Sequence, residues 1–243
     1  MLKKIFALRN RLIELYLEKK AIPKRLAFYS SFIQPGDLIF DIGANVGNRV
    51  SIFLNIGAKV VAVEPQPACI AQLNKKFGNK INVEPVCLGA VKGEMDMYIS
   101  NESTLSTLSK NFIERTGKTR FKNNQWDHQI KVNVNTLDNL IGKYGRPAFC
   151  KIDVEGFEAE VLKGLSQAIP HLSFEYCVPE MQDNLLTCLQ ALHAIAPNGK
   201  YNYSVRESME LASAVWLDHN SMIPLVNSAS FISTEFGDIY FKS

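Results

Sequence analysis

The sequence lacks the features that mark several classes of protein. Nowhere do eighteen apolar residues follow one another, so no segment is long enough to predict a membrane-spanning helix. Charged residues interrupt every apolar stretch near the N-terminus, which argues against a signal peptide. The five cysteines form no C-x-x-C pair, and most lie in apolar runs, as buried reduced thiols do. Together these absences predict a cytoplasmic protein without a disulfide scaffold.

Net charge is also small. The formal value of +3 gives no reason to expect a nucleic-acid partner. The basic residues are concentrated at one end, because residues 1–25 carry eight Lys or Arg and two Glu. A hydrophobic fraction of 47% in 243 residues is typical of a globular protein with one large domain, which needs neither a disulfide nor a structural metal.

Residues 1–35 are expected to form an N-terminal amphipathic helical segment. Its apolar stripe repeats at helical spacing within residues 2–19, and the stripe consists of Ile5, Leu8, Leu12 and Leu15. The basic charge favours peripheral contact with a membrane surface or a partner. Packing over the substrate face or against a second subunit explains the same stripe, so the sequence also allows an oligomer.

Residues 36–243 are expected to form one α/β domain. Short buried runs predict strands at 37–41, 59–63, 81–88, 149–153 and 172–178, with helices over 46–56 and from Pro67 to Gly78. Pro85 interrupts the third of these strands. Such alternation predicts a mostly parallel sheet with helices on both faces.

Residues 101–128 form a polar insertion between two half-buried strands, at 95–99 and 130–134. A loop of this length inside one domain is usually functional. Aromatic residues among amides and hydroxyls suit stacking on a sugar ring, which predicts a lid over the substrate. These aromatics, which are Phe112, Phe121 and Trp126, can equally anchor a surface loop.

A glycine-rich turn follows the first predicted strand, with the sequence Asp41-Ile-Gly43-Ala44-Asn45-Val-Gly47. Glycines at such a turn let backbone N–H groups approach a ligand at a helix N-terminus. Glu64 ends the next strand, 23 positions after Asp41. A carboxylate there can accept hydrogen bonds from both hydroxyls of a ribose. The pattern therefore predicts a nucleoside-bearing cofactor, and a turn beside a solvated glutamate is the alternative.

The residues of this turn also favour one cofactor over another. A dinucleotide site has the pattern G-x-G-x-x-G, in which the second glycine admits the pyrophosphate. Here Asn45 occupies that position and Asp41 adds negative charge. Both residues disfavour NAD, and both suit the sulfonium and ammonium groups of S-adenosylmethionine.

A second segment resembles the hallmark of a known family. Lys151-Ile-Asp-Val-Glu-Gly-Phe-Glu158, followed by Val161-Leu-Lys-Gly164, is similar to the signature of the FkbM family of methyltransferases. The matches cover roughly residues 36–180 and include FDIGANVGN at 40–48, VEPQP at 63–67, Leu88-Gly-Ala, Asn135-Thr-Leu-Asp138, Pro170 and Glu175. The sequence departs from the family mainly in residues 101–128, where substrate contacts are expected.

The resemblance implies a Rossmann-like class I methyltransferase fold with a mostly parallel seven-stranded sheet. It also implies S-adenosylmethionine as donor and O-methylation of a hydroxyl on a sugar, glycolipid or polyketide-type small molecule. The residues expected to bind the cofactor are Asp41, Gly43, Ala44, Asn45, Gly47, Glu64, Pro65 and Leu88.

Three carboxylates in the matched segments are candidates for chemistry. Asp153 and Glu155 follow the fourth predicted strand, where open sheets bind ligands, so either can act as a base or orient the acceptor. Capping the next helix or holding the cofactor's amino group explains them equally well. Glu175 is expected to anchor a loop or a structural cation. All three suit Mg²⁺, but nothing in their spacing demands a metal, and none is predicted.

Other interpretations stay open. His128, at the end of the insertion, is a candidate substrate-side base, although a lone loop histidine is usually just exposed. A non-catalytic S-adenosylmethionine-binding module, docked through its basic helix, is an alternative function. An NAD-dependent dehydrogenase is another, which Asn45 disfavours.

Overall fold

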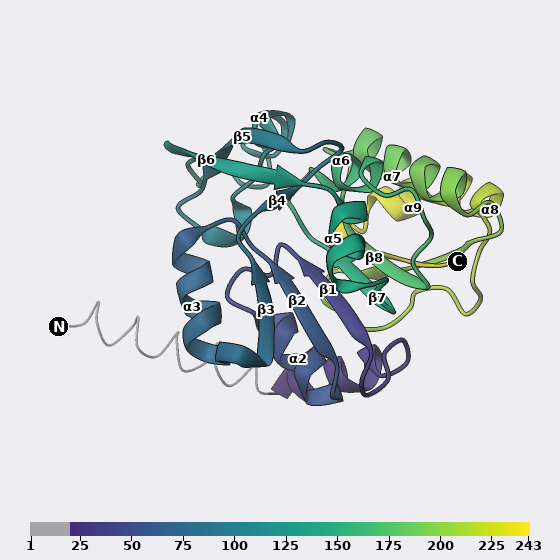
Figure 1. Ribbon diagram of the computed structural model, residues 1–243. Helices are drawn as coiled ribbons and strands as arrows, with labels where there is room; N and C mark the ends of the chain where they lie inside the picture. The colour runs from purple at the N-terminus through teal and green to yellow at the C-terminus, as the bar shows by residue number, and fades with distance from the viewer. Residues whose placement is uncertain (1–19) are drawn as a thin grey trace.

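The computed structural model describes residues 20–243 (Figure 1). The amphipathic helix predicted at residues 2–19 lies outside the described residues. Residues 20–29 are helical, and Leu26 and Tyr29 pack into the core. Within the described part of the chain, no helix is long and apolar enough to cross a membrane.

Seven strands form the main sheet, in the order β3-β2-β1-β7-β8-β10-β9. They are β1 (Leu38–Ile42), β2 (Lys59–Val63), β3 (Ile81–Glu84), β7 (Phe149–Ile152), β8 (His171–Cys177), β9 (Lys200–Val205) and β10 (Phe236–Lys242). The first five of these run parallel, while β10 is antiparallel to both β8 and β9. This mostly parallel seven-stranded sheet confirms the Rossmann-like class I methyltransferase fold.

Helices cover both faces of the main sheet (Figure 1). One face packs against residues 20–29, α2 (Asn48–Ile56) and α3 (Pro67–Phe77). The other face packs against α5 (Leu137–Tyr144), α6 (Glu158–Lys163), α7 (Gln182–Ile195), α8 (His219–Val226) and α9 (Ala229–Ile232). Since β1 pairs with β2 on one side and with β7 on the other, the carboxyl ends of these strands flank the switch point, where such sheets bind ligands.

A second, three-stranded sheet lies beyond the main sheet, at the top of Figure 1. It consists of β4 (Cys87–Leu88), β6 (His128–Asn135) and β5 (Gly93–Ile99) in that order. The prediction of one strand over 81–88 was wrong, because the chain leaves the main sheet at Pro85 and joins the small sheet as β4. Proline has no N–H to donate to a ladder, so the break falls at this residue.

The insertion at 101–128 is more structured than a loop. It contains a 3₁₀ turn (Ser103–Leu105) and α4 (Lys110–Thr116). The indole N–H of Trp126 donates to the Leu105 carbonyl at 2.7 Å, and the rings of Phe112 and Phe121 pack against each other. These contacts favour the interpretation that the aromatics anchor the insertion.

Candidate active site

A cavity opens at the carboxyl ends of β1, β2 and β7. Of the residues predicted to bind the cofactor, the cavity lining includes Gly43, Asn45, Glu64, Pro65 and Leu88. Asp41, Ala44 and Gly47 are buried behind the lining.

The glycine-rich turn packs tightly against its surroundings. At Gly43 (φ +82°), a Cβ atom would lie 1.8 Å from the carbonyl oxygen of Asp153. At Gly47 (φ +77°), it would lie 2.4 Å from the Phe77 ring. The backbone N–H groups of Gly43 and Ala44 both donate to the Val63 carbonyl. Packing and positive φ therefore require glycine at both positions, while the close approach of a ligand to this turn stays a prediction.

Glu64 is held in a fixed orientation at the cavity wall. It is 2% exposed, and its two carboxylate oxygens accept hydrogen bonds from the backbone N–H of Asn45 (2.9 Å) and of Gln66 (2.8 Å). Burial raises the pKa of the Glu64 carboxyl, and the two N–H groups counteract part of that rise. Each oxygen keeps a lone pair for a ligand hydroxyl, as the ribose prediction requires.

The lining suits S-adenosylmethionine better than a dinucleotide. Pro65, Val86 and Leu88 provide an apolar wall for a purine beside Glu64. Among the described residues that line this cavity there is no Lys or Arg, so a pyrophosphate would meet no countercharge. Asp153, by contrast, offers negative charge to a sulfonium. Val86 was not predicted, because its place depends on the split between β3 and β4.

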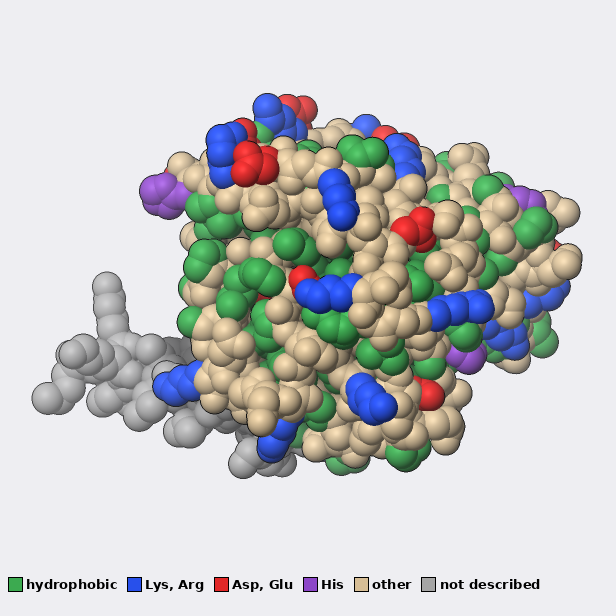
Figure 2. All heavy atoms as spheres, in the orientation of Figure 1, with side chains coloured by type: hydrophobic (Ala, Val, Ile, Leu, Met, Phe, Trp, Pro, Cys, Tyr) green, Lys and Arg blue, Asp and Glu red, His purple; other side chains and the backbone are tan. Residues whose placement is uncertain are grey.

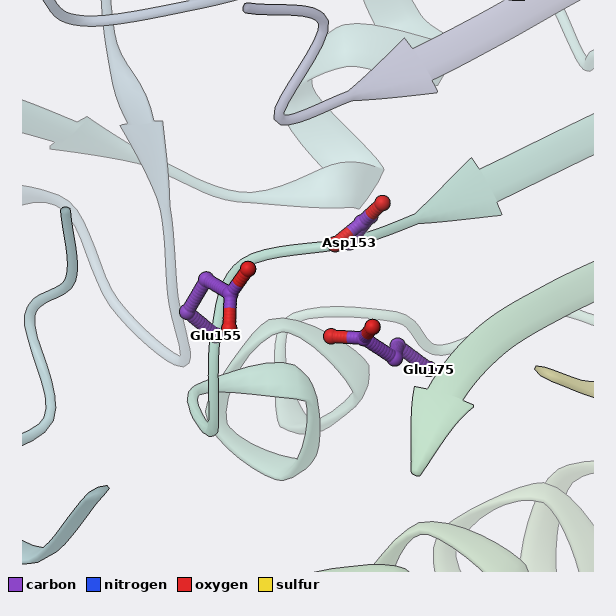
Figure 3. Close-up of side chains that lie close together, drawn as sticks. All are labelled: Asp153, Glu155 and Glu175. Atoms are coloured by element: carbon purple, nitrogen blue, oxygen red, sulfur yellow. The ribbon is translucent and has the colours of Figure 1, made fainter. Parts of the chain in front are cut away.

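Three carboxylates meet beside the cavity (Figure 3). Asp153 and Glu155 come from the loop after β7 and Glu175 from β8, and their nearest oxygens lie within 4.8 Å of one another. Burial and neighbouring negative charges raise the pKa values of Glu155 and Glu175 well above the usual range. The cluster offers oxygen ligands for a cation, while the absence of a metal stays a prediction.

One buried cation balances this cluster. Nζ of Lys151 lies 2.5 Å from Oδ2 of Asp153, and the lysine side chain is 4% exposed. The positive charge opposes the rise in the pKa of Glu155. Among the three carboxylates, Asp153 is the one that forms an ion pair.

Glu158 fixes the loop that carries Glu155, and the sequence did not predict this role. One carboxylate oxygen accepts from the N–H groups of Val154 (3.2 Å) and Gly156 (3.1 Å), and the other from the amide of Asn184 (2.7 Å). Burial raises the pKa of Glu158 to about 7. The position of Glu158 in the family hallmark was the one signal in the sequence for this role. Its partner Asn184 lies on α7, a helix that the sequence pattern did not predict.

The insertion covers the cavity from Ser103 to Leu108. The Asn45 amide donates to the Ser103 hydroxyl at 3.1 Å, and the Gln66 amide donates to the Ser103 carbonyl at 3.0 Å. On the other side, the Thr107 hydroxyl donates to the Glu155 carbonyl at 2.7 Å. This segment thus connects the two sides of the cavity. His128, in contrast, is exposed at the start of β6 and outside the lining.

Comparison with curated proteins finds distant relatives. The hexuronic acid methyltransferase AglP of Haloferax volcanii is 26% identical over 139 residues, which are 57% of this chain and 54% of that protein. A probable ribosomal RNA small subunit methyltransferase A of Methanosarcina acetivorans is 35% identical over 72 residues, 28% of this chain and 27% of that protein. The chain thus spans about half or less of the length of these relatives.

Solved structures and a family model give two further comparisons. Precorrin-6Y C5,15-methyltransferase from Geobacter metallireducens has a TM-score of 0.47 at 11% identity, covering 90% of this chain and 88% of that one. The model of the FkbM methyltransferase domain matches residues 41–206, which is most of the chain. The chain therefore belongs to the FkbM family of methyltransferases, whose methyl donor is S-adenosylmethionine.

Proposed function

We propose that this methyltransferase transfers a methyl group to a hydroxyl of a sugar or another small hydroxylated molecule. One observation supports this most: the same cavity brings Glu64, a ribose acceptor, together with Asp153, a carboxylate paired with a cation. The hexuronic acid methyltransferase among the relatives favours a sugar, although only about half of its length is matched.

On the donor side, residues of the cavity lining bind S-adenosylmethionine. Glu64 accepts hydrogen bonds from the ribose hydroxyls, and Val86 and Leu88 pack against the adenine. S-adenosylmethionine, when bound, supplies a methyl group on a positively charged sulfur. Asp41, Ala44 and Gly47 support the turn from behind, so their part in cofactor binding is indirect.

On the acceptor side, Asp153 accepts the proton of the attacking hydroxyl. General-base assistance of this kind contributes about 10²–10⁴-fold to a rate. Lys151 forms an ion pair with Asp153, and Glu155 orients the acceptor under the insertion at 101–128. Holding the oxygen in line with the methyl group supplies the rest of the acceleration.

Two measurements test this proposal. S-adenosylmethionine and S-adenosylhomocysteine, each at a hundred times its Kd, should stabilise the protein by about 2.7 kcal/mol, a rise in Tm of roughly 5–11 °C, whereas NAD should not. Transfer of labelled methyl groups to a panel of sugars and polyketide alcohols then tests the acceptor. Donor binding without transfer to any acceptor would favour a non-catalytic module, and a shift with NAD alone would favour a dehydrogenase.

The N-terminal segment needs its own test. Contact of the basic residues in 1–25 with a membrane or a second subunit stays a prediction, because residues 1–19 lie outside the described part. Sedimentation with anionic liposomes, and the molecular mass in solution, should both be compared with and without residues 1–25. Loss of either association on deletion would support the contact.

A further inference from the structure

The loop after β7 holds Glu155 in a backbone conformation that a residue with a side chain rarely adopts. Its φ is +54°, in the left-handed region, and Gly156 follows with φ +82°. In this region the Cβ atom crowds the backbone, so a glutamate persists there only where its surroundings hold it. The Glu155 carboxylate then lies beside those of Asp153 and Glu175 (Figure 3). The contacts that hold this loop therefore decide where Glu155 meets an acceptor.

Two contacts hold the loop, one from the chain that follows it and one from the insertion. The Glu158 carboxylate accepts from the N–H groups of Val154 and Gly156, at 3.2 and 3.1 Å. The Thr107 hydroxyl donates to the Glu155 carbonyl at 2.7 Å, from 48 positions earlier in the chain. Rotation of the peptide group between Glu155 and Gly156 would break this second bond. Thr107 therefore holds the backbone of Glu155 itself.

Thr107 is fixed in turn by the small sheet. Its backbone N–H donates to the Tyr98 carbonyl at 3.0 Å, and its carbonyl accepts from the Tyr98 N–H at 2.8 Å. Its hydroxyl accepts from the Ser109 N–H at 2.9 Å, which leaves the hydroxyl hydrogen for the Glu155 carbonyl. Charged side chains of both signs cover α4 and β5 at the top of Figure 2. Thr107 is only 1% exposed, so water competes little with its bond to Glu155.

We propose that Thr107 is a positioning residue, whose hydroxyl holds Glu155 in the conformation in which its carboxylate orients the acceptor. The other end of the same segment is bonded to the glycine-rich turn, through Ser103 and Asn45. Residues 103–108 thus fix the group that orients the acceptor relative to the donor, and in-line methyl transfer depends on that relation. This inference rests on the proposed function and adds a residue that acts through Glu155.

The first test removes the hydroxyl and keeps the shape of the side chain. In Thr107→Val, kcat for the best acceptor of the sugar panel should fall about 10–100-fold, because a small misplacement of an orienting group costs about this much. The affinity for S-adenosylmethionine, measured by titration calorimetry, should stay close to that of wild type. Thr107→Ser keeps the hydroxyl and should keep kcat. A wild-type kcat in Thr107→Val, or a Thr107→Ser variant as slow as Thr107→Val, would overturn the inference.

Thr116→Val is the matched control. Thr116 also lies in the insertion and is fully buried, and its hydroxyl donates to the Phe112 carbonyl at 2.7 Å within α4. Both valine variants lose one buried hydrogen bond, so urea denaturation should show comparable losses of stability. Only Thr107→Val should lose turnover. An equal fall in kcat in Thr116→Val would trace the effect to a loosened insertion and contradict the role of Thr107.

A titration of Glu155 tests the same contact without any acceptor. Burial raises the pKa of Glu155 well above the usual range. When Thr107→Val releases the loop, the carboxyl gains access to water and its pKa should fall toward the usual range. Carbon-13 NMR of labelled glutamate measures this pKa, and Glu155→Gln assigns the signal. Equal pKa values in wild type and Thr107→Val would overturn the inference. Wild-type protein that methylates no acceptor would overturn the proposed function, and this titration would still decide whether Thr107 holds Glu155.

Discussion

Lys151 and Asp153 form a buried ion pair at the edge of the active site, with Nζ 2.5 Å from Oδ2. Lys151 lies in β7, directly opposite Asp41 of β1 in the parallel register. Its charge is also felt by Asp238 of β10. One lysine thus interacts with carboxylates from β1, from the loop after β7 and from β10, and it lies outside the cavity lining.

The first prediction concerns this lysine. Lys151→Met should lower the free energy of unfolding by about 3–5 kcal/mol, since removing one partner leaves buried carboxylates without a countercharge. Urea denaturation at pH 7 measures the change. Lys131→Met is the matched control, because its pair with Asp96 is exposed and should contribute about 1 kcal/mol or less. Equal losses in the two variants would show that Lys151 does not stabilise the cluster.

The second prediction concerns donor binding. Glu64→Ala should weaken the affinity for S-adenosylmethionine about 10–100-fold, because hydrogen bonds to a charged group contribute about 1.5–3 kcal/mol. Titration calorimetry measures this affinity. Glu84→Gln is a suitable control, since Glu84 ends the adjacent strand and is bound by Lys143 and Tyr144 outside the lining. Unchanged affinity in Glu64→Ala would mean that Glu64 does not hold the ribose.

Local patterns in the sequence located the turn and the acidic residue that line one side of the cavity. The apolar run of β1, the turn after it and the acidic end of β2 are adjacent in the chain, so their relation follows from the pattern itself. Glu64 could be identified because a strand end fixes where its side chain lies. The packing that requires a glycine at position 43 could not be identified, because the neighbouring Asp153 carbonyl is far away in the sequence.

The acceptor half depends on long-range contacts. The position of β10 between β8 and β9 places Asp238 opposite Glu175, and no local pattern contains this pairing. Likewise, Pro85 signalled an interruption but not that the chain would join a second sheet. Val86, Gln66 and Glu158 were missed as site residues for the same reason, since partners elsewhere in the chain define their roles.

The third prediction tests the role of Glu158. Glu158→Gln places an amide opposite the amide of Asn184, so one hydrogen bond is lost and a donor is left buried, at a cost of about 1–3 kcal/mol. Turnover should also fall, because the loop that carries Glu155 loses its support. The double variant Glu158→Gln/Asn184→Asp restores a donor and an acceptor to this contact. A double-mutant cycle in urea should therefore give a favourable coupling, and strict additivity would exclude the contact.

The last prediction concerns Asp41 and pH. Its carboxyl is 2% exposed, and one of its oxygens has no hydrogen-bond partner among the described residues. Burial raises the pKa of Asp41 from 3.8 to about 6, although Lys151 and Arg49 oppose the rise. The folded state therefore binds more protons than the unfolded state between these values, so this group makes stability fall as pH rises from about 4 to 7.

Asp41→Asn removes that titration, so the free energy of unfolding of the variant, relative to that of wild type, should rise with pH. Relative to wild type, the variant should gain up to about 3 kcal/mol between pH 4 and pH 8, following the linkage between pKa and stability. Asp238, whose pKa is also raised to about 6, is present in both proteins and cancels in the difference. Urea denaturation at each pH provides the measurement. A stability difference that is constant over this range would mean that Asp41 stays charged when buried, with Lys151 compensating its charge in full.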